Sequence, residues 1–327
     1  MIKIKSRPKL KKPILIAAWP GMGGVAFKAV SYLMQKLPVK EFAEIPSTTY
    51  SPPTSISAKN NIIQAPYFPQ NKFYYYKDAA LKNDIILFLG ESQPSSSKQY
   101  ELAQEIVAFA KKLKVGLIYT LAGMLIYEEK TDGLKVWGVA TDSKLIDKLK
   151  TYEVKPMKAA YISGLNGLLL GVAKEAGIAG ACLLAELPFY ALQIEYTPSC
   201  LAALDVLSKM FNLKIDMKQM QASSAEAKRQ IKKLIDHIRE NLLVEEGDEE
   251  QGEMEGEEEE DTSKKLEKEL GISSEISPQV KYRIEKLFDV SKKDTKKALE
   301  LKALLDKWEL FKHYEDRFLD LFKKENQ

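Results

Sequence analysis

Short, continuous apolar runs recur along the first two thirds of the chain. Each run is bounded by glycine, proline or charged residues, which is typical of strands buried on both faces of a sheet. Four such strands are predicted, at residues 14–18, 85–89, 115–121 and 180–185. Residues 134–140 instead alternate apolar and polar positions, so they predict a half-exposed strand.

Between the strands, apolar residues follow a helical spacing. They recur at intervals of four, three and four residues in the segments 26–37 and 102–113, which places one apolar stripe along each helix. A third helix begins at Thr197-Pro198, because proline is favoured in a first turn. A fourth spans about 216–243, with an inner stripe of Ile231, Leu234, Ile235, Ile238 and Leu242. The alternation predicts an α/β fold, a mostly parallel sheet with helices on both faces.

The first predicted strand ends in a glycine-rich turn that opens a helix. The residues of this turn are Trp19, Pro20, Gly21, Met22, Gly23 and Gly24. A phosphate loop requires lysine after its last glycine, where this chain has Val25, and Pro20 and Gly24 give the turn a different shape from the dinucleotide fingerprint. Two interpretations remain: an anion or ligand site, and a tight turn whose N–H groups bond to water.

Polar residues and glycine follow the other predicted buried strands. Glu91 and Gln93 follow one, Gly123 follows the next, and Glu186 follows the last. Because the carboxyl ends of parallel strands meet at one edge of a sheet, we expect these residues to share a crevice with the glycine turn. Glu91 and Glu186 are a candidate acid–base pair. The favoured alternative is that each carboxylate caps a helix or accepts backbone N–H bonds.

Two segments interrupt this pattern. Residues 47–70 are rich in proline and predict a long loop or an edge hairpin. Residues 245–261 hold 12 acidic and no basic residues, while the rest of the chain has 49 basic and 34 acidic ones. Such a run cannot form a core and predicts a solvated linker. It divides the chain into an α/β domain, residues 1–244, and a helical tail, residues 262–327.

Composition excludes several kinds of chemistry. Cys182 and Cys200 are expected to be small buried residues, not a disulfide or a metal pair, and this fits a cytoplasmic protein. The two histidines, His237 and His313, have no metal ligand at the right spacing and are expected on helix surfaces. No metal or cofactor site is predicted. No apolar run is long enough to cross a membrane, and basic residues do not cluster as in nucleic-acid-binding proteins.

Five motifs together resemble those of one known family. They are Trp19 to Val25, Gly90 to Pro94, Thr120 to Met124, Ile162 to Leu170 and Cys182 to Pro188. In this combination and order the chain resembles the PAC2 family, the proteasome assembly chaperone 2-like proteins of archaea and bacteria, over roughly residues 10–240. The resemblance implies a three-layer α/β fold similar to nucleoside phosphorylases and peptidyl-tRNA hydrolases, and a homo-oligomer. It adds Asn166, in the fourth motif, to the residues expected at the crevice.

Two functional hypotheses follow. The preferred one is a non-catalytic, oligomeric binding or assembly-chaperone protein whose partner is a protein. Proteasome subunits enter as partners through the resemblance alone, since the chain ends in Asn326-Gln327 and lacks the hydrophobic-Tyr-x ending of docking chaperones. The alternative is a nucleoside-phosphorylase-like enzyme or small-ligand-binding protein that uses Glu91 and Glu186 as polar anchors.

Overall fold

The computed structural model contains two compact units. One spans Met1–Lys158 and Ile162–Leu270, and the other comprises Ala159–Tyr161 and Gly271–Gln327. The residues that the structure describes are 2–53, 56–126, 132–158, 162, 164–246, 284, 286–288, 290–291, 297–307, 311, 314 and 318.

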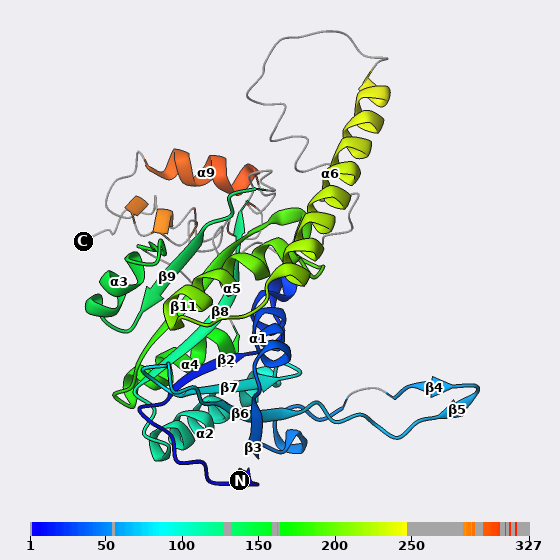
Figure 1. Cartoon of the computed structure of the whole chain (residues 1–327). Coiled ribbons are helices and arrows are strands. Elements are labelled where there is room, and N and C mark those ends of the chain that lie inside the picture. Colours follow the sequence, from blue (N-terminus) through cyan, green and yellow to red (C-terminus); the bar gives the residue numbers. More distant parts are fainter. Residues whose placement is uncertain are drawn as a thin grey trace. The chain divides into compact units, whose positions relative to one another are not determined.

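The described part of the first unit is built on one nine-stranded sheet (Figure 1). Its four central strands, β7, β2, β8 and β11, are parallel. They correspond to the four predicted buried strands, and β8 extends five residues beyond the predicted end because β11 pairs with it along its whole length. In order across the sheet, the strands are β1 (Lys3–Ile4), β3 (Lys40–Glu44), β6 (Asn71–Tyr76), β7 (Ile85–Gly90), β2 (Ile14–Ala18), β8 (Leu117–Ile126), β11 (Ala179–Pro188), β9 (Val136–Ala140) and β10 (Lys155–Pro156).

The predicted α/β class is confirmed, but the sheet is mixed and not mostly parallel. Strands β1, β3 and β6 are antiparallel to their neighbours, as is β9 to β11. A short connection explains the antiparallel pairing of β6 with β7. Residues 77–84 join β6 to β7, whereas a parallel crossover needs a dozen residues or more. The sheet therefore has a parallel centre and antiparallel flanks.

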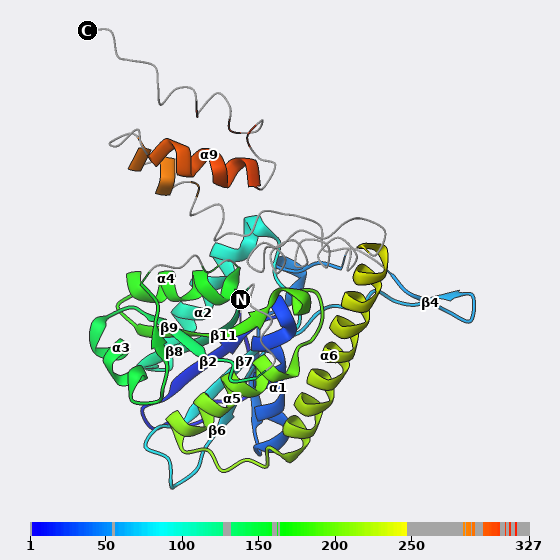
Figure 2. The ribbon, with the colours of Figure 1, turned by 90° about the horizontal axis from the view of Figure 1, so that it is seen from above.

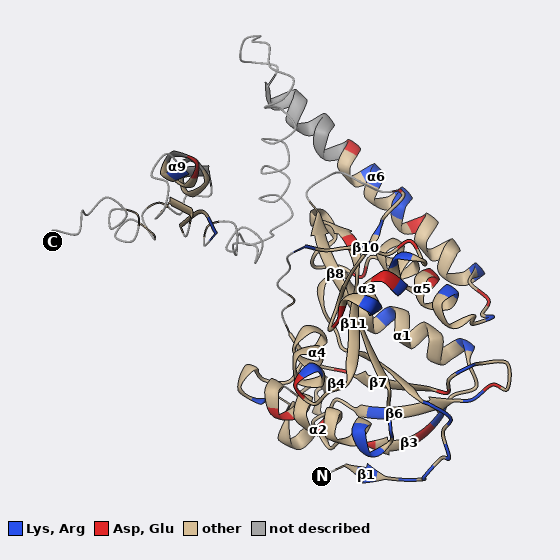
Figure 3. Cartoon of the chain, turned by 90° about the vertical axis from the view of Figure 1, so that its left-hand side faces the viewer, with Lys and Arg blue, Asp and Glu red and all other residues tan. Residues whose placement is uncertain are grey.

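Helices cover both faces of this sheet, which completes the three layers (Figures 2 and 3). Alternate side chains of β2 point to opposite faces. Ile14 and Ile16 pack with α1 (Val25–Lys36), α3 (Ser143–Lys150) and α5 (Thr197–Phe211). Leu15 packs on the other face with α2 (Gln99–Lys112) and α4 (Leu165–Glu175). The stripes predicted on the helices at 26–37 and 102–113 face these two clusters, with Leu113 only partly buried.

The long helix α6 (Lys218–Glu246) matches the prediction in extent but only partly in its buried stripe. Ile231 and Ile235 are buried against an aromatic cluster that includes Tyr190 and Tyr196. Leu234 is 41% exposed, so its place in the stripe was predicted wrongly. Leu234 precedes Ile235 by one residue, and successive side chains of a helix point about 100° apart, so Leu234 points away from the buried face. Side chains beyond residue 236, including those of His237, Ile238 and Leu242, lie outside the described ones.

The proline-rich segment contains a hairpin, as one of the two predicted alternatives has it, but this hairpin does not join the edge of the main sheet. Strands β4 (Ala58–Lys59) and β5 (Ile62–Ile63) pair with each other and form a separate two-stranded sheet. The hairpin projects away from the body (Figures 1 and 2). We call residues 56–70 the arm.

The second unit has an apolar cluster of its own. Ile284, Phe288, Leu301 and Leu305 are buried in it, and its described residues are helical, including α9 (Lys297–Lys307). The predicted helices of the tail therefore pack on each other. His313 and residues 247–261 of the predicted linker lie outside the described residues. Among the described helices, none combines the length and apolarity that a membrane crossing requires.

Candidate functional site

The glycine turn lies at the carboxyl edge of the parallel strands, as predicted. Gly23 and Gly24 have φ of 62° and 65°, which glycine adopts without strain. The Gly23 N–H donates to the Leu192 carbonyl over 3.3 Å, and the Gly23 carbonyl accepts from the Tyr196 N–H over 2.9 Å. The turn is therefore tied to the segment that follows β11.

The chain's own atoms approach this turn closely. A Cβ on Gly23 would lie 2.5 Å from Leu187 Cδ1, and a Cβ on Gly123 would lie 3.0 Å from the Met22 carbonyl oxygen. Real Cβ atoms almost never come as close as the first contact, and the second is tighter than nine in ten of their contacts. Close packing of the turn against β8 and β11 therefore accounts for these glycines without an external ligand.

Gln93 connects the turn to the start of α4. Its Nε2 donates to the Pro20 carbonyl over 2.7 Å, and its Oε1 accepts from the Leu165 N–H over 3.3 Å. Asn166 is buried beside the turn, with Nδ2 3.7 Å from the position of a Cβ on Gly21. Its Oδ1 has no hydrogen-bond partner among the described residues. The structure thus brings Gln93, Asn166 and the glycine turn together.

Glu186 is buried and bonded across the sheet. Its carboxylate accepts from the Lys135 backbone N–H over 2.9 Å and from Trp137 Nε1 over 3.0 Å. Its carbonyl accepts from Ser199 Oγ over 2.6 Å. These bonds hold β9 and α5 against β11, which is the favoured structural interpretation of this carboxylate.

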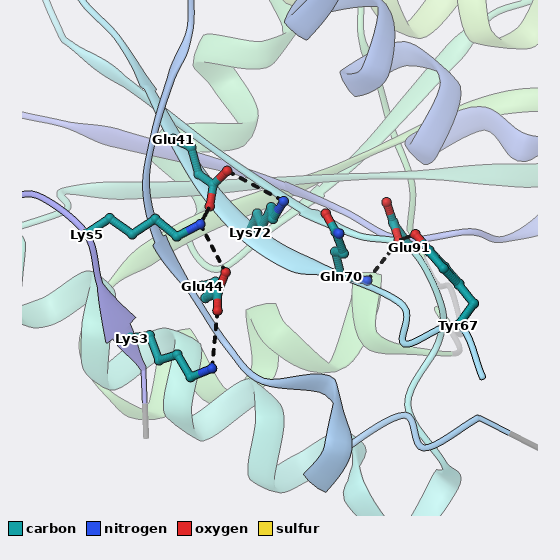
Figure 4. A network of polar contacts seen from close by, with 8 residues as sticks. All are labelled: Lys3, Lys5, Glu41, Glu44, Tyr67, Gln70, Lys72 and Glu91. Carbon is teal, nitrogen blue, oxygen red and sulfur yellow. Dashed lines mark hydrogen bonds and ion pairs between the residues drawn. The ribbon is translucent and has the colours of Figure 1, made fainter. Parts of the chain in front are cut away.

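Glu91 has different partners, at the base of the arm (Figure 4). Its carboxylate accepts from the Tyr67 hydroxyl and, over 2.8 Å, from the Gln70 backbone N–H. The hydrogen bond to this carboxylate raises the pKa of Tyr67. Glu91 follows β7 and Glu186 lies on β11, so three interstrand steps of about 4.8 Å separate their strands. The two carboxylates therefore do not form an acid–base pair.

The cysteines are free and buried, as predicted. Burial raises the pKa of both Cys182 and Cys200 to about 12. Thiols are nucleophilic as thiolates, so neither is an activated nucleophile at neutral pH. Among the described residues, no group of three or more His, Cys, Asp and Glu side chains has the arrangement of a metal site.

Sequence reasoning missed several residues that build this region. Tyr67 and Gln70 belong to the proline-rich segment, and Lys135 and Trp137 belong to the strand next to Glu186. The aromatic pair Tyr67 and Phe68 in the proline-rich segment was the available signal. Trp19 Nε1 and both polar side-chain atoms of Asn71 are buried without hydrogen-bond partners among the described residues.

Comparison with known proteins places the chain in a family. The family model described as "PAC2 family" matches residues 15–235, well over half of the chain. The chain belongs to the PAC2 family. Two uncharacterized proteins of Methanocaldococcus jannaschii are 28% and 29% identical to it, over 67% and 72% of this chain and 81% and 91% of their own lengths.

Solved structures of similar fold cover about three quarters of this PAC2 chain. Pyrococcus furiosus PbaB, described as an archaeal proteasome activator, is 27% identical with a TM-score of 0.62, over 72% of this chain and 98% of PbaB. P. furiosus PbaA, described as an archaeal homolog of proteasome-assembly chaperone, is 24% identical with a TM-score of 0.56, over 75% and 96%. The likeness to PbaA shows the shared fold alone.

Proposed function

We propose that this PAC2 protein is a non-catalytic, oligomeric binding protein that assists the assembly or activity of a larger protein complex. The proteasome is the first candidate partner. The observation that carries this proposal is the similarity to the proteasome activator PbaB, which extends over 98% of that chain. A cytoplasmic location is part of the proposal, and the two unpaired cysteines support it.

The geometry at the strand ends favours a binding role over catalysis. Glu91, just after β7, and Glu186, on β11, accept hydrogen bonds from their own chain. Gln93 is engaged by the glycine turn and α4. Exposed apolar side chains, among them those of Met22 and Ile194 beside the glycine turn, remain available for contacts with other protein chains.

The proposal is tested by capture of the proteasome from the same organism on the full-length protein. We expect proteasome subunits to be retained, and either their assembled fraction or their peptidase activity to rise. Tyr100→Lys, at an exposed position on α2 away from the strand ends, should leave retention unchanged. A folded protein that neither retains proteasome subunits nor changes their assembly would contradict the proposal.

The enzyme hypothesis is tested separately with nucleosides, nucleotides and inorganic phosphate. We expect no ligand-dependent rise in the melting temperature, since the carboxylates that were to anchor such ligands are already bonded. Phosphorolysis of any nucleoside by the purified protein would refute the non-catalytic assignment.

A further inference from the structure

The arm is a hairpin that its own sequence specifies. Asn60 and Asn61 have φ of 51° and 64°, the positive values that both central residues of a type I′ turn require and that asparagine tolerates. On either side of the turn, β4 and β5 pair in register, and the Gln64 N–H donates to the Ser57 carbonyl over 2.8 Å. The arm is therefore a regular β-hairpin with defined strand pairing.

Hydrogen bonds fix the arm at its base. Glu91 accepts from Tyr67 and Gln70 on one side, and its own N–H donates to the Gln70 carbonyl over 2.9 Å. On the other side, the Ser95 N–H donates to the Tyr50 carbonyl over 3.1 Å. The loop that follows β7 thus holds the second leg of the arm and also bonds to Tyr50, ahead of the arm, and the arm is aimed away from its own body (Figure 1).

The surface of the arm is apolar and almost uncharged. Lys59 is the single charged residue among residues 56–70. Adjacent strand residues point to opposite faces, so Ile62 and Ile63, 66% and 70% exposed, leave both faces of the hairpin uncovered. A two-stranded hairpin is marginally stable in water unless something packs against it. The other large apolar side chains exposed on the arm are those of Ile56, Tyr67 and Phe68.

The outer edge of the main sheet is protected quite differently. Lys3 pairs with Glu44 over 3.5 Å, Lys72 pairs with Glu41 over 3.5 Å, and Lys5 bonds to both carboxylates (Figure 4). Charges along an edge strand discourage pairing with another chain. The arm lacks this protection, which points to a surface that is covered in the working protein.

The same body presents an apolar patch of matching chemistry. Met22 and Ile194 are 38% and 47% exposed, and the bonds from Gly23 to Leu192 and Tyr196 bring their two segments together. This patch follows β2 and β11, and the base of the arm follows β7. Patch and arm therefore share the carboxyl edge of the parallel strands.

We propose that the arm of one copy of this chain docks on the Met22–Ile194 patch of a second copy, and that the second copy reciprocates. When two copies meet at the sheet edges where their parallel strands end, each arm contacts the patch of the other copy. The two contacts are identical, so the dimer has twofold symmetry and leaves no arm or patch free for a third copy. The exposed isoleucines of the arm match the exposed apolar side chains of Met22 and Ile194, and the charged neighbour of the patch, Glu195, is paired with Lys28 over 2.7 Å. The inference rests on the oligomeric part of the proposed function and names the surface that forms the oligomer.

Light scattering of the isolated protein tests this surface. We expect the full chain to be a dimer or a multiple of one, and the variant with Ile62→Lys and Ile63→Lys to be monomeric at the same concentration, with an association at least 10-fold weaker. Ile4→Lys, at an exposed isoleucine of β1, is the matched control and should leave the mass unchanged. Circular dichroism checks that all variants remain folded.

Cysteine cross-linking identifies the receptor. Copies with Ile62→Cys are mixed with copies with Ile194→Cys and treated with a short bis-maleimide, while native Cys182 and Cys200 are buried. We expect a covalent dimer in the mixture and neither variant to cross-link alone.

The outcomes separate this inference from the proposed function. Cross-linking of Ile62→Cys copies with each other would indicate contact between arms and overturn arm-to-patch docking. An oligomer that survives the lysine substitutions would overturn the inference alone. A monomeric full chain would also remove the oligomeric part of the proposed function, whereas proteasome capture is measured independently. Loss of capture by lysine variants of unchanged mass would assign the arm to the partner protein instead.

Discussion

Gly90 stands where any side chain would collide with the indole of Trp19. A Cβ at this position would lie under 3.0 Å from Trp19 Nε1 and 2.8 Å from Asn71 Oδ1. Trp19 is fully buried against Phe88, so the indole has little room to move. The glycine that precedes Glu91 is therefore explained by packing inside the body.

We predict that Gly90→Ala lowers the free energy of unfolding by about 1–3 kcal/mol, the usual cost of overpacking a core. Urea denaturation measures the change. Gly171→Ala is the matched control, since a Cβ there meets nothing within 4 Å. Alanine is also the better helix former, so this control should stabilise α4 by up to about 1 kcal/mol. Equal stability of the two variants would contradict the packing argument.

The buried thiols give a second prediction, for alkaline pH. The folded pKa of Cys182 and Cys200 is about 12, while an unfolded thiol has a pKa of about 8.5. Below pH 8.5 both states are protonated. Above it the unfolded state alone ionises, so stability falls as pH rises toward 12.

The variant with Cys182→Ala and Cys200→Ala should therefore show a shallower loss of stability between pH 8.5 and 10. The difference should reach about 2 kcal/mol per thiol at pH 10, as a shift of one pKa unit corresponds to about 1.4 kcal/mol. Denaturation curves at several pH values provide the measurement. Parallel curves for the two proteins would show that burial does not suppress thiol ionisation.

At the scale of elements, one loop joins three parts of the molecule. In the segment after β7, Glu91 bonds to the arm, Ser95 bonds to Tyr50 ahead of the arm, and Gln93 bonds to the glycine turn and the start of α4. The motif Gly90 to Pro94, from which the sequence predicts a crevice, thus bonds neighbouring segments of the fold together in the structure.

We predict that Gln93→Ala destabilises the protein by about 1–3 kcal/mol, because it leaves the Pro20 carbonyl and the Leu165 N–H without their partner. Hydrogen exchange should quicken at Leu165. Gln64→Ala is the control, as Gln64 Nε2 bonds only locally, to the Ile62 carbonyl. Unchanged exchange at Leu165 would show that Gln93 is not the link.

The four central strands could be predicted because burial on both faces leaves unbroken apolar runs. Strands β3 and β6 were not predicted, since at the flank they are interrupted by charged and polar residues, as in Lys40–Glu44. Helix α4 was treated only as a motif because Gly167 and Gly171 interrupt its helical pattern. In α4, the packing of its buried leucines outweighs the low helix propensity of these two glycines.

The sequence predicted which residues lie at the candidate site, but it did not predict the hydrogen bonds that they form. The positions of the glycine turn and Gln93 follow from strand order, since strand ends meet at one edge, whereas Asn166, in the first turn of α4, was expected from the family resemblance alone. The partners of the two carboxylates depend on which strand lies beside which. Trp137 reaches Glu186 only because β9 is antiparallel to β11, and the spacing of residues does not give that pairing.

On the scale of the whole molecule, the chain has two units with separate apolar clusters. Helical segments as short as these gain most of their stability from packing against each other. Leu301, fully buried in the second cluster, is therefore a sensitive position for that unit.

We predict that Leu301→Asp in the full chain removes helical circular dichroism that belongs to the second unit and leaves the main melting transition in place. Lys302→Ala is the adjacent control. Leu204→Asp, in the core of the first unit, should instead abolish the main transition. A shift of the main transition by Leu301→Asp would show that the two units unfold together.

The near absence of charge on the arm has a thermal consequence. Contacts made by an uncharged apolar surface are hardly screened by salt, and they weaken on cooling because burial of such surface is driven by entropy near room temperature. Assemblies held by residues 56–70, with Lys59 as the single charge, should withstand molar sodium chloride, dissociate toward 4 °C, and re-form on warming or in sulfate.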